Sequence, residues 1–171
     1  MNFRRSKGIR LAVVVAAAVG VLAFSLAISH TSTSKVLGKE NMTTLLPTVS
    51  SDAGVAPVIG MPAGQAPAAL TKREIIVGKG KVALTGSTIT AQYVLMSWKS
   101  GKVLQSSWAN GAFTSPLAGV IPGWQKGIPG MKVGGRRLLV IPPALAYGAA
   151  GGQGVGPNET LIFVVDLLGV K

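Results

Sequence analysis

Residues 120–137 (VIPGWQKGIPGMKVGGRR) are the one part of this chain's second half whose pattern suits a helix. Their glycine and proline content allows only one or two helical turns, around 121–128, with Pro122 suited to the first helical position. Runs of alternating or branched apolar residues predict β-strands on both sides, at 72–80, 87–98, 102–108, 112–117, 136–142 and 160–168. We therefore expect an antiparallel sheet whose apolar face is covered by this short helix.

Finer features of the strands lead to further expectations. In segment 87–98, Ile89, Ala91, Tyr93 and Leu95 alternate with polar residues, which predicts a strand with one buried face. Asp166, in the last strand, is expected to form a structural hydrogen bond. The tryptophans beside the predicted turns are expected to pack at the surface, and they are Trp98 and Trp108.

Three segments are expected from composition. Residues 1–29 combine a basic start with the uncharged run 11–29, which is typical of a secretory signal or of a membrane anchor. Small residues permit cleavage near Ala27 or Ser29, but as a helix the run would span roughly 28 Å, close to the thickness of a bilayer core, so we favour a retained anchor. Residues 30–46 are Ser/Thr-rich and predict a flexible linker. Either form of the N-terminus places residues 47–171, the remaining domain, outside the cytoplasm, secreted or membrane-anchored.

The start of that domain has a weaker pattern. Residues 47–70 contain many prolines and glycines, and we expect one short edge strand around 56–60, where proline is tolerated.

The charge is strongly positive, at +12 from 17 Lys and Arg against 5 Asp and Glu. Beyond the N-terminus the basic residues are single or paired, as in Arg136-Arg137, and no helix-length basic stripe accompanies a nucleic-acid-binding motif. We therefore expect no nucleic-acid site, but a solvated cationic surface suited to anionic polymers. The absence of cysteine excludes disulfides, thiol nucleophiles and zinc–thiolate sites, and the single histidine, His30, has no partner of its kind.

Taken together, residues 120–148, 156–168 (GPNETLIFVVDLL) and 89–108 (ITAQYVLMSWKSGKVLQSSW) resemble FKBP-type peptidyl-prolyl cis-trans isomerases. The resemblance covers about 71–171 well and 47–70 weakly. It implies an α+β fold, in which a curved antiparallel sheet of five to six strands wraps around one short α-helix. It further implies a shallow aromatic pocket that receives a prolyl ring.

The resemblance also implies roles for individual residues. Trp124 would form the pocket floor and Tyr93 one wall, while the Tyr147 hydroxyl and the Ile121 N–H would donate hydrogen bonds; these four would be catalytic. The other substrate-binding residues would be Leu104, Gln105, Phe113, Val120, Val155 on an overhanging loop, and Phe163.

This set contains no acid, base or nucleophile, which suits an X–Pro rotation. The barrier of about 18–20 kcal/mol arises from amide resonance, and no bond is made or cut. A twisted amide loses much of its dipole, so a desolvated aromatic pocket with one or two fixed donors stabilises it. The resemblance implies no metal or cofactor. The expected partners are proline-containing unfolded or folding polypeptides and FK506-like macrolides, with the protein as a monomer.

Two positions differ from the family pattern. Leu104 stands where phenylalanine is usual and Gln105 where aspartate is usual. Loss of an electrostatic transition-state contact lowers a rate by roughly ten- to a thousand-fold. Two alternatives to an isomerase therefore stay open: a proline-binding chaperone or adaptor with weak or no activity, and a cell-envelope domain that docks on anionic partners.

Overall fold

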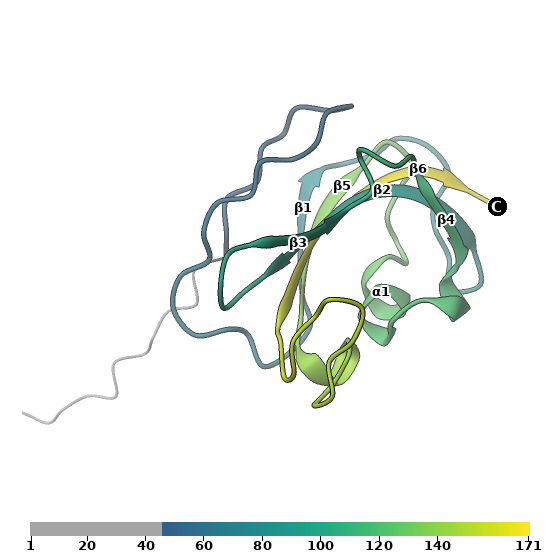
Figure 1. Ribbon diagram of the computed structural model, residues 1–171. Coiled ribbons are helices and arrows are strands. Elements are labelled where there is room, and N and C mark those ends of the chain that lie inside the picture. The colour runs from purple at the N-terminus through teal and green to yellow at the C-terminus, as the bar shows by residue number, and fades with distance from the viewer. Residues whose placement is uncertain (1–45) are drawn as a thin grey trace, which may run out of the picture. The chain divides into compact units, whose positions relative to one another are not determined.

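The structure is a computed structural model that describes residues 46–171 (Figure 1). The predicted signal or anchor at 1–29, residues 30–45 of the predicted linker and His30 lie outside the described residues. In chain order the elements are β1 (Thr71–Ile76), β2 (Thr88–Ser97), β3 (Val103–Ser106), β4 (Phe113–Pro116), the 3₁₀ turn η1 (Leu117–Gly119), α1 (Pro122–Gly127), β5 (Arg136–Ile141), the 3₁₀ turn η2 (Pro143–Leu145) and β6 (Leu161–Val170).

The strands form one antiparallel sheet of six strands with the order β1-β5-β6-β2-β3, and β4 also pairs with β2. Within residues 46–171 this confirms the predicted sheet and its single short α-helix. The long strand β2 changes partner along its edge, because Ala91 lies opposite Phe113 of β4, whereas Val94 lies opposite Ser106 of β3. The edge is therefore split beside Tyr93, where the chain leaves the sheet between β3 and β4.

Helix α1 packs on the concave face of the sheet, directly against β5. Two glycines make this close approach possible. A Cβ on Gly123 would lie 2.4 Å from Ile141 Cγ2, and a Cβ on Gly127 would lie 2.9 Å from Leu139 Cδ1. The core on this face contains, among others, Ile89, Ala91, Leu95, Trp124, Ile128, Leu139, Ile141, Phe163 and Leu167.

The opposite face of the sheet is covered by residues 46–66, which we call the N-terminal strap (Figure 1). Its apolar residues pack against a second core cluster, so the part of β2 from Val94 onwards is buried on both faces. The prediction of a single buried face is therefore wrong for that half of the strand. Trp98 also belongs to this cluster and is only 8% exposed, so the expected surface position is wrong as well.

The strap itself is irregular. Residues 56–60 form no strand; one isolated bridge joins Val49 to Ile59. The prolines and glycines of this segment prevent a continuous ladder, and the strap is held mainly by other contacts.

The main such contact is Arg136, whose side chain is fully buried. It forms a two-bond ion pair with Asp166, at 2.6 and 2.7 Å, and donates to the carbonyls of Ser50 (2.9 Å) and Val55 (2.7 Å) in the strap. The predicted structural hydrogen bond of Asp166 is confirmed. The solvated surface position expected for Arg136 is wrong, because its guanidinium is surrounded by partners from the sheet and the strap.

Its neighbour Arg137 is also buried, at 7% exposure. It pairs with Glu74 of β1 and donates to the carbonyl of Gly127 at the end of α1. This arginine therefore ties the helix to the sheet rather than contributing to a cationic surface, and the surface prediction is wrong here too.

Among residues 46–171, no helix is long and apolar enough to cross a membrane.

Candidate active site

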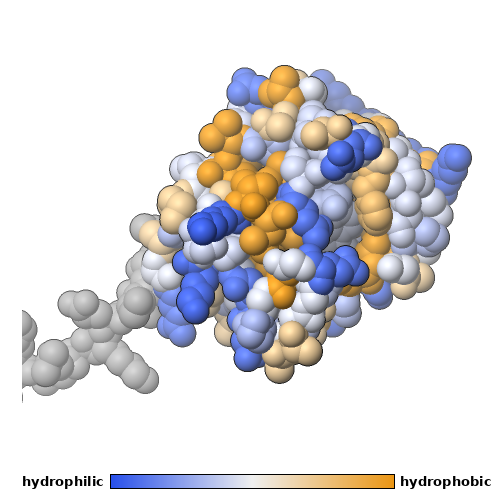
Figure 2. All heavy atoms as spheres, viewed as in Figure 1, coloured by the Kyte–Doolittle hydropathy of each residue, from blue (hydrophilic) through white to orange (hydrophobic). Residues whose placement is uncertain are grey.

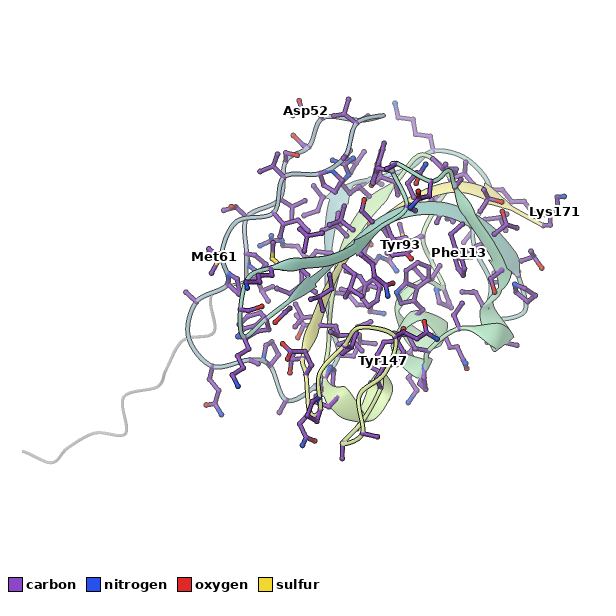
Figure 3. All side chains as sticks on the ribbon, viewed as in Figure 1. Asp52, Met61, Tyr93, Phe113, Tyr147 and Lys171 are labelled. Atoms are coloured by element: carbon purple, nitrogen blue, oxygen red, sulfur yellow. The ribbon has the colours of Figure 1, made fainter. Side chains whose placement is uncertain are left out.

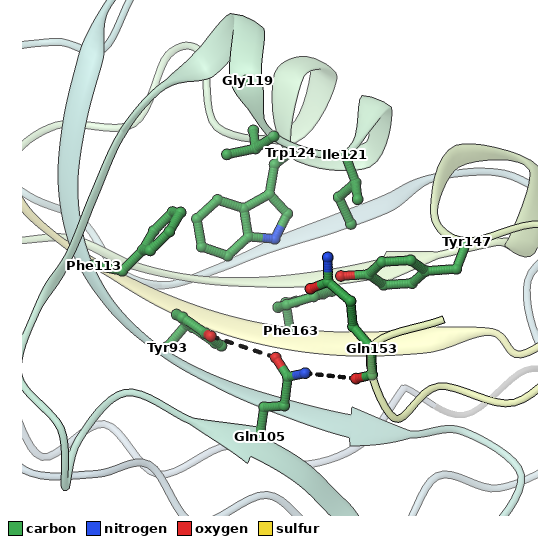
Figure 4. Close-up of a pocket in the computed structure, with 10 residues that line it drawn as sticks. Tyr93, Gln105, Phe113, Gly119, Ile121, Trp124, Tyr147, Gln153 and Phe163 are labelled. Carbon is green, nitrogen blue, oxygen red and sulfur yellow. Dashed lines mark hydrogen bonds between the residues drawn. The ribbon is translucent and has the colours of Figure 1, made fainter. Parts of the chain in front are cut away.

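A cavity of about 300 Å³ lies between the concave face of the sheet, α1 and the loop after η2. Figure 3 shows Tyr93 from β2, Phe113 from β4 and Tyr147 from that loop converging on this region. The close-up in Figure 4 shows the cavity with its lining, which comprises Tyr93, Gln105, Phe113, Gly119, Val120, Ile121, Trp124, Tyr147, Gln153 and Phe163.

Aromatic rings form the floor and walls of the cavity. Trp124 is 3% exposed and packs edge-to-face against Phe163, with ring centroids 5.4 Å apart, and against Tyr93 at 5.6 Å. Phe113 stands at the rim, 37% exposed, with its ring 6.0 Å from those of both Tyr93 and Trp124. Each such pair contributes about 0.5–1.5 kcal/mol beyond the burial of its surface. The floor is thus closely packed and largely apolar.

The peptide unit between Val120 and Ile121 supplies a donor at the start of α1. The Gln125 side chain donates to the Val120 carbonyl at 2.7 Å. Because a trans peptide is planar, this bond turns the Ile121 N–H of the same unit in the opposite direction. Within the described part of the chain that N–H has no backbone partner, so it is available to a ligand carbonyl.

The Tyr147 hydroxyl is a second donor, and it points into the cavity (Figure 4). Burial raises the pKa of this hydroxyl above its ordinary value, and the nearby Tyr93 raises it further. The higher pKa keeps the phenol protonated, and therefore able to donate, throughout the neutral and mildly alkaline range.

Gln105 lies on the side of the cavity formed by β3. Its Oε1 is 3.5 Å from the Tyr93 hydroxyl, and its Nε2 donates to the backbone carbonyl of Gln153 at 2.8 Å (Figure 4). The polar groups of the lining residues are amides, hydroxyls, backbone groups and the buried indole N–H of Trp124, and these residues include no Asp, Glu, Lys, Arg or His.

The structure brings together most of the residues that the resemblance pointed to. Eight line the cavity: Tyr93, Gln105, Phe113, Val120, Ile121, Trp124, Tyr147 and Phe163. Leu104 and Val155 do not: Leu104 packs on the core cluster behind the cavity, and Val155 is itself a buried core residue, 7% exposed.

Two lining residues, Gly119 and Gln153, are absent from the prediction. Gly119 ends η1, and because it has no side chain the sequence offered no functional group that would mark it as a lining residue. Gln153 lies in the glycine-rich stretch after Tyr147, where it was the one residue with a functional side chain between 148 and 154.

The model of the family described as FKBP-type peptidyl-prolyl cis-trans isomerase matches residues 79–168, more than half of the chain. The chain belongs to this family. The matched residues, 79–168, include every residue that lines the cavity.

Known members of the FKBP family are close in sequence. A probable FK506-binding protein of Corynebacterium glutamicum is 46% identical over 113 residues, covering 66% of this chain and 96% of the relative. An FK506-binding protein of Streptomyces anulatus is 44% identical over 119 residues, covering 67% and 96%. The protein is thus a peptidyl-prolyl cis-trans isomerase that acts on proline-containing peptides.

Solved structures have the same fold. The crystal structure of FkpA from Escherichia coli is similar with a TM-score of 0.57 and 41% identity, over 60% of this chain and 48% of that one. The crystal structure of AtFKBP13 has a TM-score of 0.56 and 34% identity, over 62% of this chain and 96% of that one. The FKBP fold is confirmed.

Proposed function

We propose that this FKBP accelerates X–Pro rotation in polypeptides that fold outside the cytoplasm, and that Tyr93, Ile121, Trp124 and Tyr147 act on the rotating amide. The observation that carries the proposal is an aromatic cavity with two donors, the Ile121 N–H and the Tyr147 hydroxyl, and no ionisable acid or base in the range of neutral pH.

The proposed mechanism is non-covalent. In this proposal the prolyl ring lies over the indole of Trp124, with the rings of Tyr93 and Phe113 beside it as apolar walls. As the amide twists, it loses its conjugation and part of its dipole. The apolar walls therefore disfavour the planar, more polar ground state relative to the twisted state. The Ile121 N–H or the Tyr147 hydroxyl then holds the carbonyl that the rotation displaces.

The test is isomerisation of a Leu-Pro-Phe peptide by the purified full-length protein, with and without FK506. Acceleration that the macrolide abolishes is expected. It would show that activity resides in this cavity, and that Leu104 and Gln105 are compatible with turnover.

The alternative of a proline-binding chaperone is favoured by Gln105, which places a neutral amide where a carboxylate is usual in the family. In the same test this alternative predicts tight macrolide binding without acceleration. The face in Figure 2 has a central band and a narrower band of apolar residues, with hydrophilic residues between them. On this face the apolar residues are divided rather than joined in the broad surface that a general holdase would use, and the proposal places peptide binding in the aromatic cavity.

The pH dependence provides a second test of the mechanism. Because the cavity contains no carboxylate or imidazole and the pKa of Tyr147 is raised, kcat/KM is expected to stay constant from about pH 6 to 9.5. It should fall only at higher pH, as the phenol ionises and its donor is lost.

Tyr147→Phe is the matched variant. It should lower kcat/KM by about two- to tenfold, the value of one hydrogen bond, and make the decline at high pH smaller. A bell-shaped profile centred near neutral pH, measured from steady-state rates, would instead indicate an acid or base that this mechanism does not contain.

The location outside the cytoplasm rests on the basic start and the apolar run at 11–29. Digestion of intact cells with an external protease, after permeabilisation of any outer layer, tests it. The isomerase domain should be cleaved while a cytoplasmic marker survives; protection of both would refute an external domain.

A further inference from the structure

The stretch after Tyr147 forms a compact loop beside the cavity, which we call the glycine loop (residues 148–158). Its base is closed by the Asn158 N–H, which donates to the Gly148 carbonyl at 3.0 Å. Its tip is a tight turn in which Gly152 and Val155 exchange both backbone hydrogen bonds, at 2.9 and 3.0 Å. Val155 anchors one side of this turn in the core.

The other side of the tip contacts β3 through Gln105. The Nε2 of Gln105 donates to the Gln153 carbonyl at 2.8 Å across the open side of the cavity (Figure 4). The backbone angle φ of Gln153 is positive, at 52°, and φ is also positive at the glycines 151, 152 and 154. A run of such residues has little conformational preference of its own, so the position of the tip depends on the contacts it makes.

The chemistry of the two partners determines the orientation of the Gln105 amide. A backbone carbonyl can only accept, so the amide nitrogen must face Gln153. The amide oxygen then faces the Tyr93 hydroxyl, which can donate to it, at 3.5 Å. A carboxylate at this position could accept from Tyr93 but could not donate to the loop. Asparagine, one methylene shorter, would not reach both groups.

We infer that Gln105 is a positioning residue, which holds the tip of the glycine loop over the cavity and thereby sets how tightly the peptide beside the proline is held. The inference rests on the proposed use of this cavity for prolyl peptides. Gln153 lines the cavity, so release of the tip removes one wall from the bound peptide. The Tyr93 ring, whose hydroxyl contacts Gln105, is held by Trp124 and Phe163, and the aromatic floor and the two donors lie elsewhere, so the rotation step itself is affected much less.

The experiment compares Gln105→Glu and Gln105→Met with the unmodified full-length protein. Glutamate keeps the size and the acceptor but loses the donor; methionine loses both polar atoms without adding a charge that repels the carbonyl. In both variants the amide protons of Gly152 and Val155, which close the tip, should exchange with solvent about two- to tenfold faster. KM for a prolyl peptide should rise by a similar factor, with kcat changed less than twofold.

The control is Gln153→Asn. It keeps the backbone carbonyl that accepts the bond, and asparagine tolerates the positive φ. Exchange at Gly152 and Val155 should therefore remain as in the unmodified protein. Unchanged exchange in both Gln105 variants would overturn the inference, as would a change in Gln105→Glu alone, which would indicate charge repulsion rather than a lost donor. Because exchange is measured without substrate, this outcome is independent of whether the proposed catalytic function holds.

Discussion

Replacement of Trp124 by alanine should lower the free energy of unfolding by about 3–5 kcal/mol, the usual cost of removing a large buried aromatic side chain. The indole is 3% exposed and contacts three other rings, so its removal leaves a hole between α1 and the sheet. Because a domain of this size is stable by about 5–15 kcal/mol, urea unfolding should show a large fall in the midpoint.

The same variant should lose at least about tenfold in kcat/KM, even under conditions where it is folded. A loss of 1.4 kcal/mol in transition-state binding is enough for that factor, and Trp124 is the surface on which the prolyl ring would lie. Trp124→Leu, which retains part of the volume, keeps the test meaningful if the alanine variant does not fold. It should be less destabilised and still be impaired in catalysis.

Trp98→Ala is the matched control. Trp98 is also a buried tryptophan, but it lies on the opposite face of the sheet under the strap. Its removal should cost a similar free energy and leave kcat/KM of the folded protein close to normal. If both variants lost stability and activity in the same proportion, Trp124 would be a core residue without a special place in the site.

The second large effect is expected from Asp166→Ala. This change leaves the fully buried guanidinium of Arg136 without its carboxylate, and breaking a buried pair in this way costs about 3–5 kcal/mol. The strap should be loosened as well, because the two bonds of Arg136 to the Ser50 and Val55 carbonyls depend on the position of the guanidinium. Urea unfolding measures the first effect, and limited proteolysis within residues 50–56 the second.

Two further sets of variants show whether the loss of stability comes from leaving a charge unpaired in the core or from losing any ion pair. The double change Arg136→Met with Asp166→Leu should cost less than Asp166→Ala alone, because no unpaired charge remains in the core. Glu74→Gln, in the pair with Arg137, should cost at most about 1 kcal/mol, since the Glu74 side chain is 41% exposed and the pair is screened by water. An Asp166→Ala variant as stable as Glu74→Gln would mean that the buried pair contributes little.

The elements of this fold were predictable because their signals are local. Alternation in 87–98, branched residues in 136–142 and 160–168, and Pro122 at the helix start each depend on neighbours within a few positions, and each element formed where expected. The short 3₁₀ turns were not predicted, since a single turn carries almost no periodicity. The site followed from a motif rather than from chemistry, because a pocket that acts without ionisable groups leaves no pattern of acids or bases to detect.

The remaining features depend on pairs that are distant in the chain. Gln105 and Gln153 are 48 residues apart, and the bond between them ends on a backbone carbonyl, which every residue has. Val155 was predicted from the resemblance but has a different place, because it lies in the core cluster beneath its loop and not over the cavity.

The sequence alone determined the order of the six strands of the sheet, the one α-helix within residues 46–171 and the aromatic composition of the site. Tertiary structure decided which faces and charges are buried: the strap covers what alternation had marked as an open face of the sheet, and Arg136 finds Asp166, Val55 and Ser50 at 30, 81 and 86 residues' separation. The physical reason is that backbone periodicity is set by local sterics. The burial of a side chain depends on which distant segment excludes water from it, and that is established only when the whole chain has packed.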